Sequence, residues 1–162
     1  MSHKYTIEAL RELLAARRDS AQALRTCSES HRTEPLRSIC ARAAVECGMA
    51  VRELEALIER LGAEPYGRPT WSHLWRSGWA SLRSALACDE EGAILDACEH
   101  GESRTLEAYR NALDDPLPEF VRELVLRQFE RVMSTHEAIR ECRILRPLRG
   151  EVARPGAQAG QH

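Results

Sequence analysis

Residues 36–62 read LRSICARAAVECGMAVRELEALIERLG, and this stretch decides the fold class. Its apolar residues recur at alternating steps of three and four, the spacing that places side chains on one face of an α-helix. Glu46 is the one acidic member of that face. Pro35 suits the first turn of a helix, and Gly62 suits the position just after its end. The sequence therefore predicts a helix of about seven turns between them.

The same spacing predicts three more long helices, over about residues 7–27, 89–113 and 121–139. Short turns join the first helix to the second and the third to the fourth, so each pair is expected to run antiparallel. Residues 63–70 hold prolines and a glycine and predict a loop, and residues 70–86 predict a short amphipathic helix. The sequence thus predicts an all-α four-helix bundle with a short extra helix in the crossover between helices two and three.

Composition sets the domain organisation and narrows the class of protein. A chain of 162 residues with 43% hydrophobic residues fits one bundle domain, which we place at residues 1–143. Residues 144–162 are rich in Arg, Pro and Gly and predict a disordered tail. The net charge of −2 argues against nucleic acid as a partner. No membrane-length apolar run is present, and charges interrupt residues 1–14, so we expect neither a membrane nor export, but a cytoplasmic protein.

Several segments resemble a bacterial family of ferritin-like four-helix bundles of unknown function, distantly related to rubrerythrin and bacterioferritin. The likeness covers about residues 4–143 and implies the fold, a role in stress physiology and a dimetal-carboxylate ancestry. Its implied cofactor is iron or another divalent metal, although nothing else in the sequence requires a cofactor. The segments that carry it are RSGW at 76–79, LRSAL at 82–86, AIL at 93–95, CEHGE at 98–102, LEAY at 106–109 and HEAIR at 136–140.

Four residues are the candidate metal ligands: Glu46, Glu99, Glu102 and His136. Di-iron bundles use Glu-x-x-His on two helices because residues three apart project inward together. That motif is absent from this sequence. We therefore expect a degenerate site in a non-enzymatic binding protein, with a metal-binding protein or oxidoreductase as the alternative.

The candidate ligands also have a purely structural interpretation, in which each finds a polar partner inside the bundle. If each antiparallel pair folds back at its turn, residues equally far from the turn lie opposite each other. On this basis we expect an Arg17–Glu46 ion pair and a Glu102–Gln128 hydrogen bond. The same reasoning leaves His136 near Asp96 or Glu99. Buried charges are normally paired in this way, so the sequence leaves both interpretations open.

Cysteines and tryptophans offer two further sites. Six cysteines are present without a C-x-x-C pair, and we expect them to be reduced. Cys40, Cys47 and Cys98 lie on predicted helix faces and could bind copper(I) or zinc, if they share one cavity. Trp71, Trp75 and Trp79 form a stripe that either packs across the bundle or docks a second subunit, so a homodimer fits the resemblance.

Overall fold

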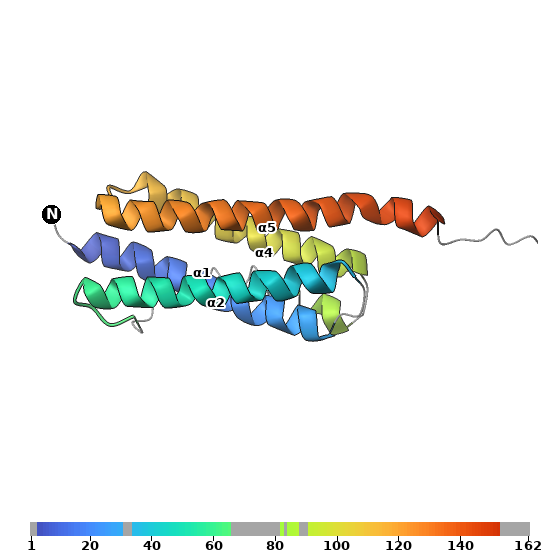
Figure 1. Ribbon diagram of the computed structural model, residues 1–162, viewed down its shortest axis with the longest axis horizontal. Helices are drawn as coiled ribbons and strands as arrows, with labels where there is room; N and C mark the ends of the chain where they lie inside the picture. Colours follow the sequence, from blue (N-terminus) through green and yellow to red (C-terminus); the bar gives the residue numbers. More distant parts are fainter. Residues whose placement is uncertain (1–2, 31–33, 66–81, 83, 88–90, 153–162) are drawn as a thin grey trace, which may run out of the picture.

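Four long helices form the protein in the computed structural model, which describes residues 3–30, 34–65, 82, 84–87 and 91–152. They are α1 (His3–Ser30), α2 (Leu36–Arg60), α4 (Glu91–Asp114) and α5 (Glu119–Val152). They pack lengthwise as a bundle (Figure 1), in which α1 contacts α2 and α4 while α5 contacts α4 and α2. Residues 84–87 belong to the short helix α3 between α2 and α4. The predicted all-α bundle with its extra crossover helix is confirmed.

Helices α2 and α4 run in the same direction along the bundle (Figure 1). Helices α1 and α2 form one antiparallel hairpin, and α4 and α5 form the other (Figure 1). The last turn of α2 and the first turn of α4 therefore lie at opposite ends of the bundle. The predicted crossover therefore has the expected direction. Trp71, Trp75 and Trp79 lie outside the described residues, so their role stays a prediction.

The end of α2 follows from the glycine noted in the sequence. Gly62 has a φ of +83°, a conformation that a residue without a Cβ adopts at little cost. Its N–H donates to Glu59 O at 2.9 Å, and the N–H of Ala63 donates to Ile58 O at 3.2 Å. These two bonds satisfy carbonyls that the end of a helix otherwise leaves open. The predicted stop at Gly62 is confirmed.

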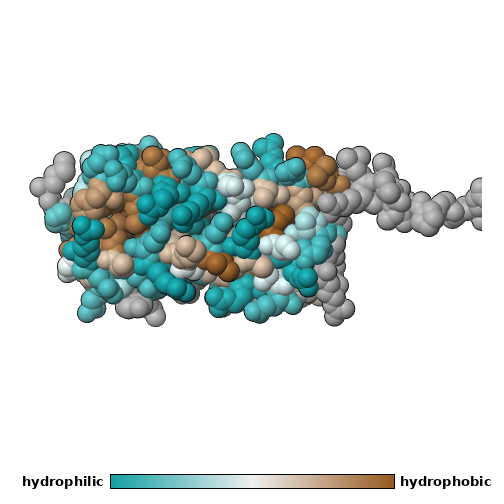
Figure 2. All heavy atoms as spheres, in the orientation of Figure 1, coloured by the Kyte–Doolittle hydropathy of each residue, from teal (hydrophilic) through white to brown (hydrophobic). Residues whose placement is uncertain are grey.

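Helix α5 continues beyond the predicted domain boundary at residue 143. It runs to Val152 and projects past the other helices (Figure 1). Residues 153–162 are outside the described part of the chain, so the disorder predicted for the tail stays a prediction. The surface seen in Figure 2 is mostly hydrophilic, with small separate apolar areas. None of the described helices combines the length and apolarity needed to cross a membrane.

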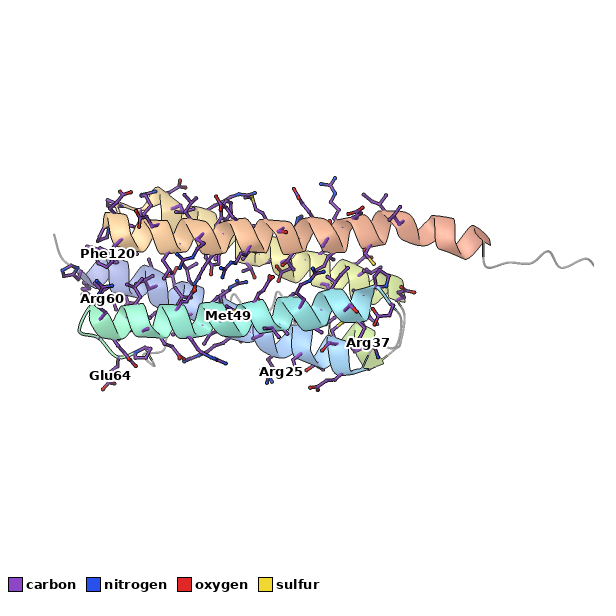
Figure 3. All side chains as sticks on the ribbon, in the orientation of Figure 1. Arg25, Arg37, Met49, Arg60, Glu64 and Phe120 are labelled. Carbon is purple, nitrogen blue, oxygen red and sulfur yellow. The ribbon has the colours of Figure 1, made fainter. Side chains whose placement is uncertain are left out.

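The buried side chains form two apolar clusters. One contains Leu10, Leu54 and Val125 and lies toward the end of the bundle where α2 ends. At that end the Arg60 guanidinium lies 5.6 Å from the centre of the Phe120 ring (Figure 3). The other cluster lies toward the α1–α2 turn. It is formed by buried apolar residues of all five helices, among them Leu24, Leu36, Leu82, Ala85, Ile94, Leu95 and Ile139. Between the two clusters α1 and α4 bury several polar side chains.

Candidate functional site

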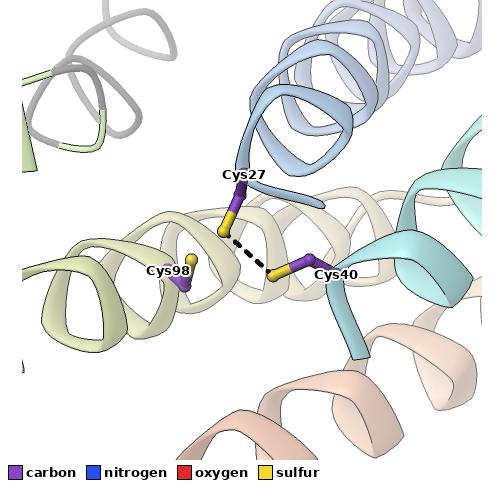
Figure 4. A group of neighbouring side chains, drawn as sticks. All are labelled: Cys27, Cys40 and Cys98. Atoms are coloured by element: carbon purple, nitrogen blue, oxygen red, sulfur yellow. Dashed lines mark hydrogen bonds between the residues drawn. The ribbon is translucent and has the colours of Figure 1, made fainter. Parts of the chain in front are cut away.

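Three cysteine thiols meet inside the apolar cluster near the α1–α2 turn. Cys27 comes from the end of α1, Cys40 from the start of α2 and Cys98 from α4 (Figure 4). Their Sγ atoms all lie within 4.8 Å of one another, and each residue is 0% exposed. The Cys40 thiol donates to Cys27 Sγ at 3.2 Å. Three separate helices thus direct sulfur to one point.

This cluster stands out among possible metal ligands. Within the described ranges 3–30, 34–65, 82, 84–87 and 91–152, it is the one set of three or more His, Cys, Asp or Glu ligand atoms that lie this close together. Thiolate sulfur binds thiophilic ions such as copper(I) and zinc. The cluster therefore presents the ligand type that such ions prefer.

Two of the thiols, Cys40 and Cys98, have raised pKa values that favour the protonated form. Sulfur contacts with Cys27 and Cys40, followed by burial, raise the pKa of Cys98 well above the ordinary value for a thiol. The hydrogen bond with Cys27 is the largest cause that raises the pKa of Cys40, and burial adds to it. Since the thiolate is the nucleophile, these thiols are poor nucleophiles and depend on a metal to remove their protons.

Sequence reasoning found two members of this cluster and misplaced the third. The thiol hypothesis required Cys47 to share a cavity with Cys40 and Cys98, but its Sγ accepts a hydrogen bond from Arg17 Nη1 at 3.4 Å. Burial raises the pKa of Cys47 to about 12, against the opposing effect of Arg17. Cys27 was missed, although a signal for it exists. Cys27 and Cys40 are equally far from the middle of the turn at 33–34, so a reflection about that turn pairs them.

Two candidate carboxylate ligands, Glu102 and Glu46, lie in different environments within the bundle. Glu102 is 1% exposed, and its Oε1 has no hydrogen-bond partner. Burial raises the pKa of Glu102 to about 7, although Arg17 opposes the shift. Glu46 lines a cavity of about 150 Å³ between α2 and α5, where it accepts a hydrogen bond from Thr135 at 3.4 Å.

The other two candidates have partners of their own. Glu99 pairs with Arg143, which also pairs with Asp96 at 3.2 Å. His136 Nε2 lies 3.0 Å from Ser103 Oγ. The expected contact of His136 with Asp96 or Glu99 is therefore replaced by Ser103, one turn along α4.

Arg17 supplies the positive charge at the centre of the bundle. It is 2% exposed, and its guanidinium lies 5.7 Å from the centre of the Tyr109 ring. Burial acts to lower the pKa of Arg17, yet Tyr109, Cys47 and the two carboxylates raise it overall. The predicted Arg17–Glu46 ion pair is not among the ion pairs of the described residues, and the charges of Glu102 and Glu46 both raise the pKa of Arg17. Gln128 bonds to Tyr109 Oη at 2.7 Å and to Glu53 at 2.8 Å, not to Glu102 as expected.

A protein-family model described as a domain of unknown function, DUF2383, matches residues 5–115. The chain belongs to the DUF2383 family. The matched part of this DUF2383 protein contains Cys27, Cys40 and Cys98, whereas His136 lies beyond it. No curated protein matches the chain.

Proposed function

We propose that this DUF2383 protein is a non-enzymatic binding protein for a thiophilic metal ion, which it holds through Cys27, Cys40 and Cys98. The observation that carries the proposal is the convergence of three Sγ atoms within 4.8 Å. A chance cluster of buried cysteines has the same apolar surroundings, because free cysteine is a common core residue. Three thiols from three helices, all aimed at one point (Figure 4), favour a ligand set over simple packing.

The raised thiol pKa values favour binding over catalysis. A catalytic cysteine needs a lowered pKa and access to substrate, and Cys40 and Cys98 have neither. A reducing cytoplasm would keep the three thiols available. Handling of a thiophilic ion also agrees with the stress-related role that the ferritin-like resemblance implies.

Iron or another divalent metal at the carboxylates is the second candidate. One observation favours it, because the buried Glu102 Oε1 has no hydrogen-bond partner. Two observations weigh against it: Arg17 already brings a cation to Glu102 and Glu46, and Glu99 and His136 contact Arg143 and Ser103. This donor set fits iron poorly, and we derive no chemistry from it.

Titration of the reduced, untagged, metal-free protein with cadmium(II) tests the proposal. Cadmium(II) is thiophilic, and its charge-transfer absorption reports thiolate ligands. We expect about one ion per chain at the three-thiol site. Cys98→Ala should abolish this binding, while the matched control Cys142→Ala should retain it. Helicity measured by circular dichroism shows whether each variant folds.

Equal cadmium binding by the two variants would refute the proposal. Loss of iron(II) binding in Glu102→Ala, with cadmium binding unaffected by Cys98→Ala, would instead favour the carboxylate site. If Cys98→Ala fails to fold, Cys98→Ser offers a smaller change in volume at the same position.

A further inference from the structure

We infer that the ion held by Cys27, Cys40 and Cys98 is monovalent copper, an inference that rests on the proposed thiol site. Thiolate ligands alone do not decide between copper(I) and zinc(II), since both bind sulfur well. The decision comes from the number of ligands, their spacing and the surroundings of the three sulfurs.

The number of ligands favours copper(I). Zinc in structural sites takes four ligands in a tetrahedron. The described residues bring three ligand atoms together here, and the residues packed around them are apolar. Copper(I) has a filled d shell and accepts two or three sulfur ligands, so the trio is complete for it. A zinc ion would need a fourth ligand, such as a water molecule, in this apolar cluster.

Charge does not separate the two ions. Zinc(II) with three thiolates carries a net charge of −1, and so does copper(I) with two thiolates and one thiol. Each thiolate forms by release of one proton to solvent, so copper(I) can bind with one proton fewer than zinc(II).

The spacing of the sulfurs fits a three-coordinate ion. A metal–sulfur bond of about 2.3 Å places the sulfurs of a trigonal site about 4 Å apart. The three Sγ atoms lie within 4.8 Å of one another, and those of Cys27 and Cys40 are 3.2 Å apart. That pair has to separate by about 1 Å, which rotation about χ1 provides without movement of the helices.

Burial also suits the chemistry of copper(I), because oxygen oxidises this ion and because the hydrated ion disproportionates in water. All three cysteines are 0% exposed, and leucine and isoleucine side chains from all five helices belong to the same buried cluster. Such a site excludes water and protects the lower oxidation state. The same exclusion raises the cost of any ligand set that depends on water.

Anaerobic competition with the copper(I) chelator bathocuproine disulfonate tests the inference. We expect one copper(I) per chain to resist the chelator, and excess zinc(II) not to displace it. X-ray absorption of this complex should give two or three sulfur ligands. Loss of an outer-shell partner typically weakens metal binding about 10- to 100-fold. Cys98→Ala removes a direct ligand, so it should weaken copper(I) binding by more than this. Cys142→Ala should leave the affinity within a few-fold.

Two results would overturn the inference while leaving the proposed function intact. One is tighter binding of zinc(II) than of copper(I) at the same cysteines. The other is a four-sulfur site, revealed if Cys88→Ser, at a position outside the described residues, weakens binding as much as Cys98→Ala. Failure of both cadmium(II) and copper(I) to depend on Cys98 would instead refute the thiol site itself.

Discussion

The Sγ atoms of Cys27 and Cys40 lie 3.2 Å apart, across the turn that joins α1 to α2. They are thiols in van der Waals reach of each other, and Cys98 completes the trio from the other hairpin. Their burial and their protonation determine how the site should react with reagents, protons and metal.

Alkylation of the native protein should spare these three cysteines. Because all three are fully buried and the pKa values of Cys40 and Cys98 are raised, iodoacetamide should modify Cys27, Cys40 and Cys98 at least about 100-fold more slowly than in denaturant. Peptide mass spectrometry at timed intervals measures each rate. Rapid native labelling of Cys98 would show that the cluster opens readily to solvent.

Metal affinity at the thiol site should increase with pH. The folded protein holds the protons of Cys40 and Cys98 to a higher pH than ordinary thiols, so the ion competes with protons throughout the neutral range. Each displaced proton should raise the apparent affinity about tenfold per pH unit. Chelator competition at several pH values measures the slope. An affinity independent of pH would mean that thiolates are not formed on binding.

Replacement of Glu102 by Gln should remove a pH-dependent cost. The pKa of Glu102 in the folded protein is about 7, above its ordinary value of 4.5, so the folded state holds a proton that the unfolded state releases. Stability is therefore lost as pH rises from about 5 to 7, by about 3 kcal/mol at most. Urea unfolding of Glu102→Gln and the parent protein at pH 5 and 8 measures this. We expect the variant to gain on the parent as pH rises; an equal difference at both pH values would contradict the assignment.

Removal of the buried charge on Arg17 should be far more harmful than removal of a neighbouring exposed one. Arg17→Met leaves Glu102 without its cation and should cost about 3–5 kcal/mol at pH 8. Arg18→Met is the matched control, because Arg18 pairs with Glu55 near the surface, where a pair contributes about 1 kcal/mol or less. Thermal and urea unfolding compare the two variants. Similar losses in both would show that Arg17 is not important to the buried carboxylate.

The helices could be predicted because their signals are local. The apolar spacing of residues 36–61 and the glycine at 62 determine α2 almost without reference to the rest of the chain. The length of the crossover likewise predicted the parallel arrangement of α2 and α4. These features depend on periodicity and on turn residues, which a single sequence displays.

The partners of buried polar residues were harder to predict because they depend on register between helices. Reflection of the helices about their turn placed His136 near Asp96 or Glu99, whereas His136 lies beside Ser103. Ser103 is one to two turns further along α4, and periodicity alone does not reveal such a change of register. Cys27 was missed for a related reason, since its pairing with Cys40 depends on where the turn between Ser30 and Leu36 has its middle.

The crossover gives the thiol site a mechanical consequence. Cys27 and Cys40 belong to one hairpin and Cys98 to the other, and the long segment between residues 40 and 98 is all that joins these two ligand positions along the chain. An ion bound to all three would therefore crosslink the two hairpins at one end of the bundle, whereas apolar packing and the Arg60–Phe120 contact join them at the other end. Hydrogen exchange should slow at the crosslinked end when metal binds, and less at the far end.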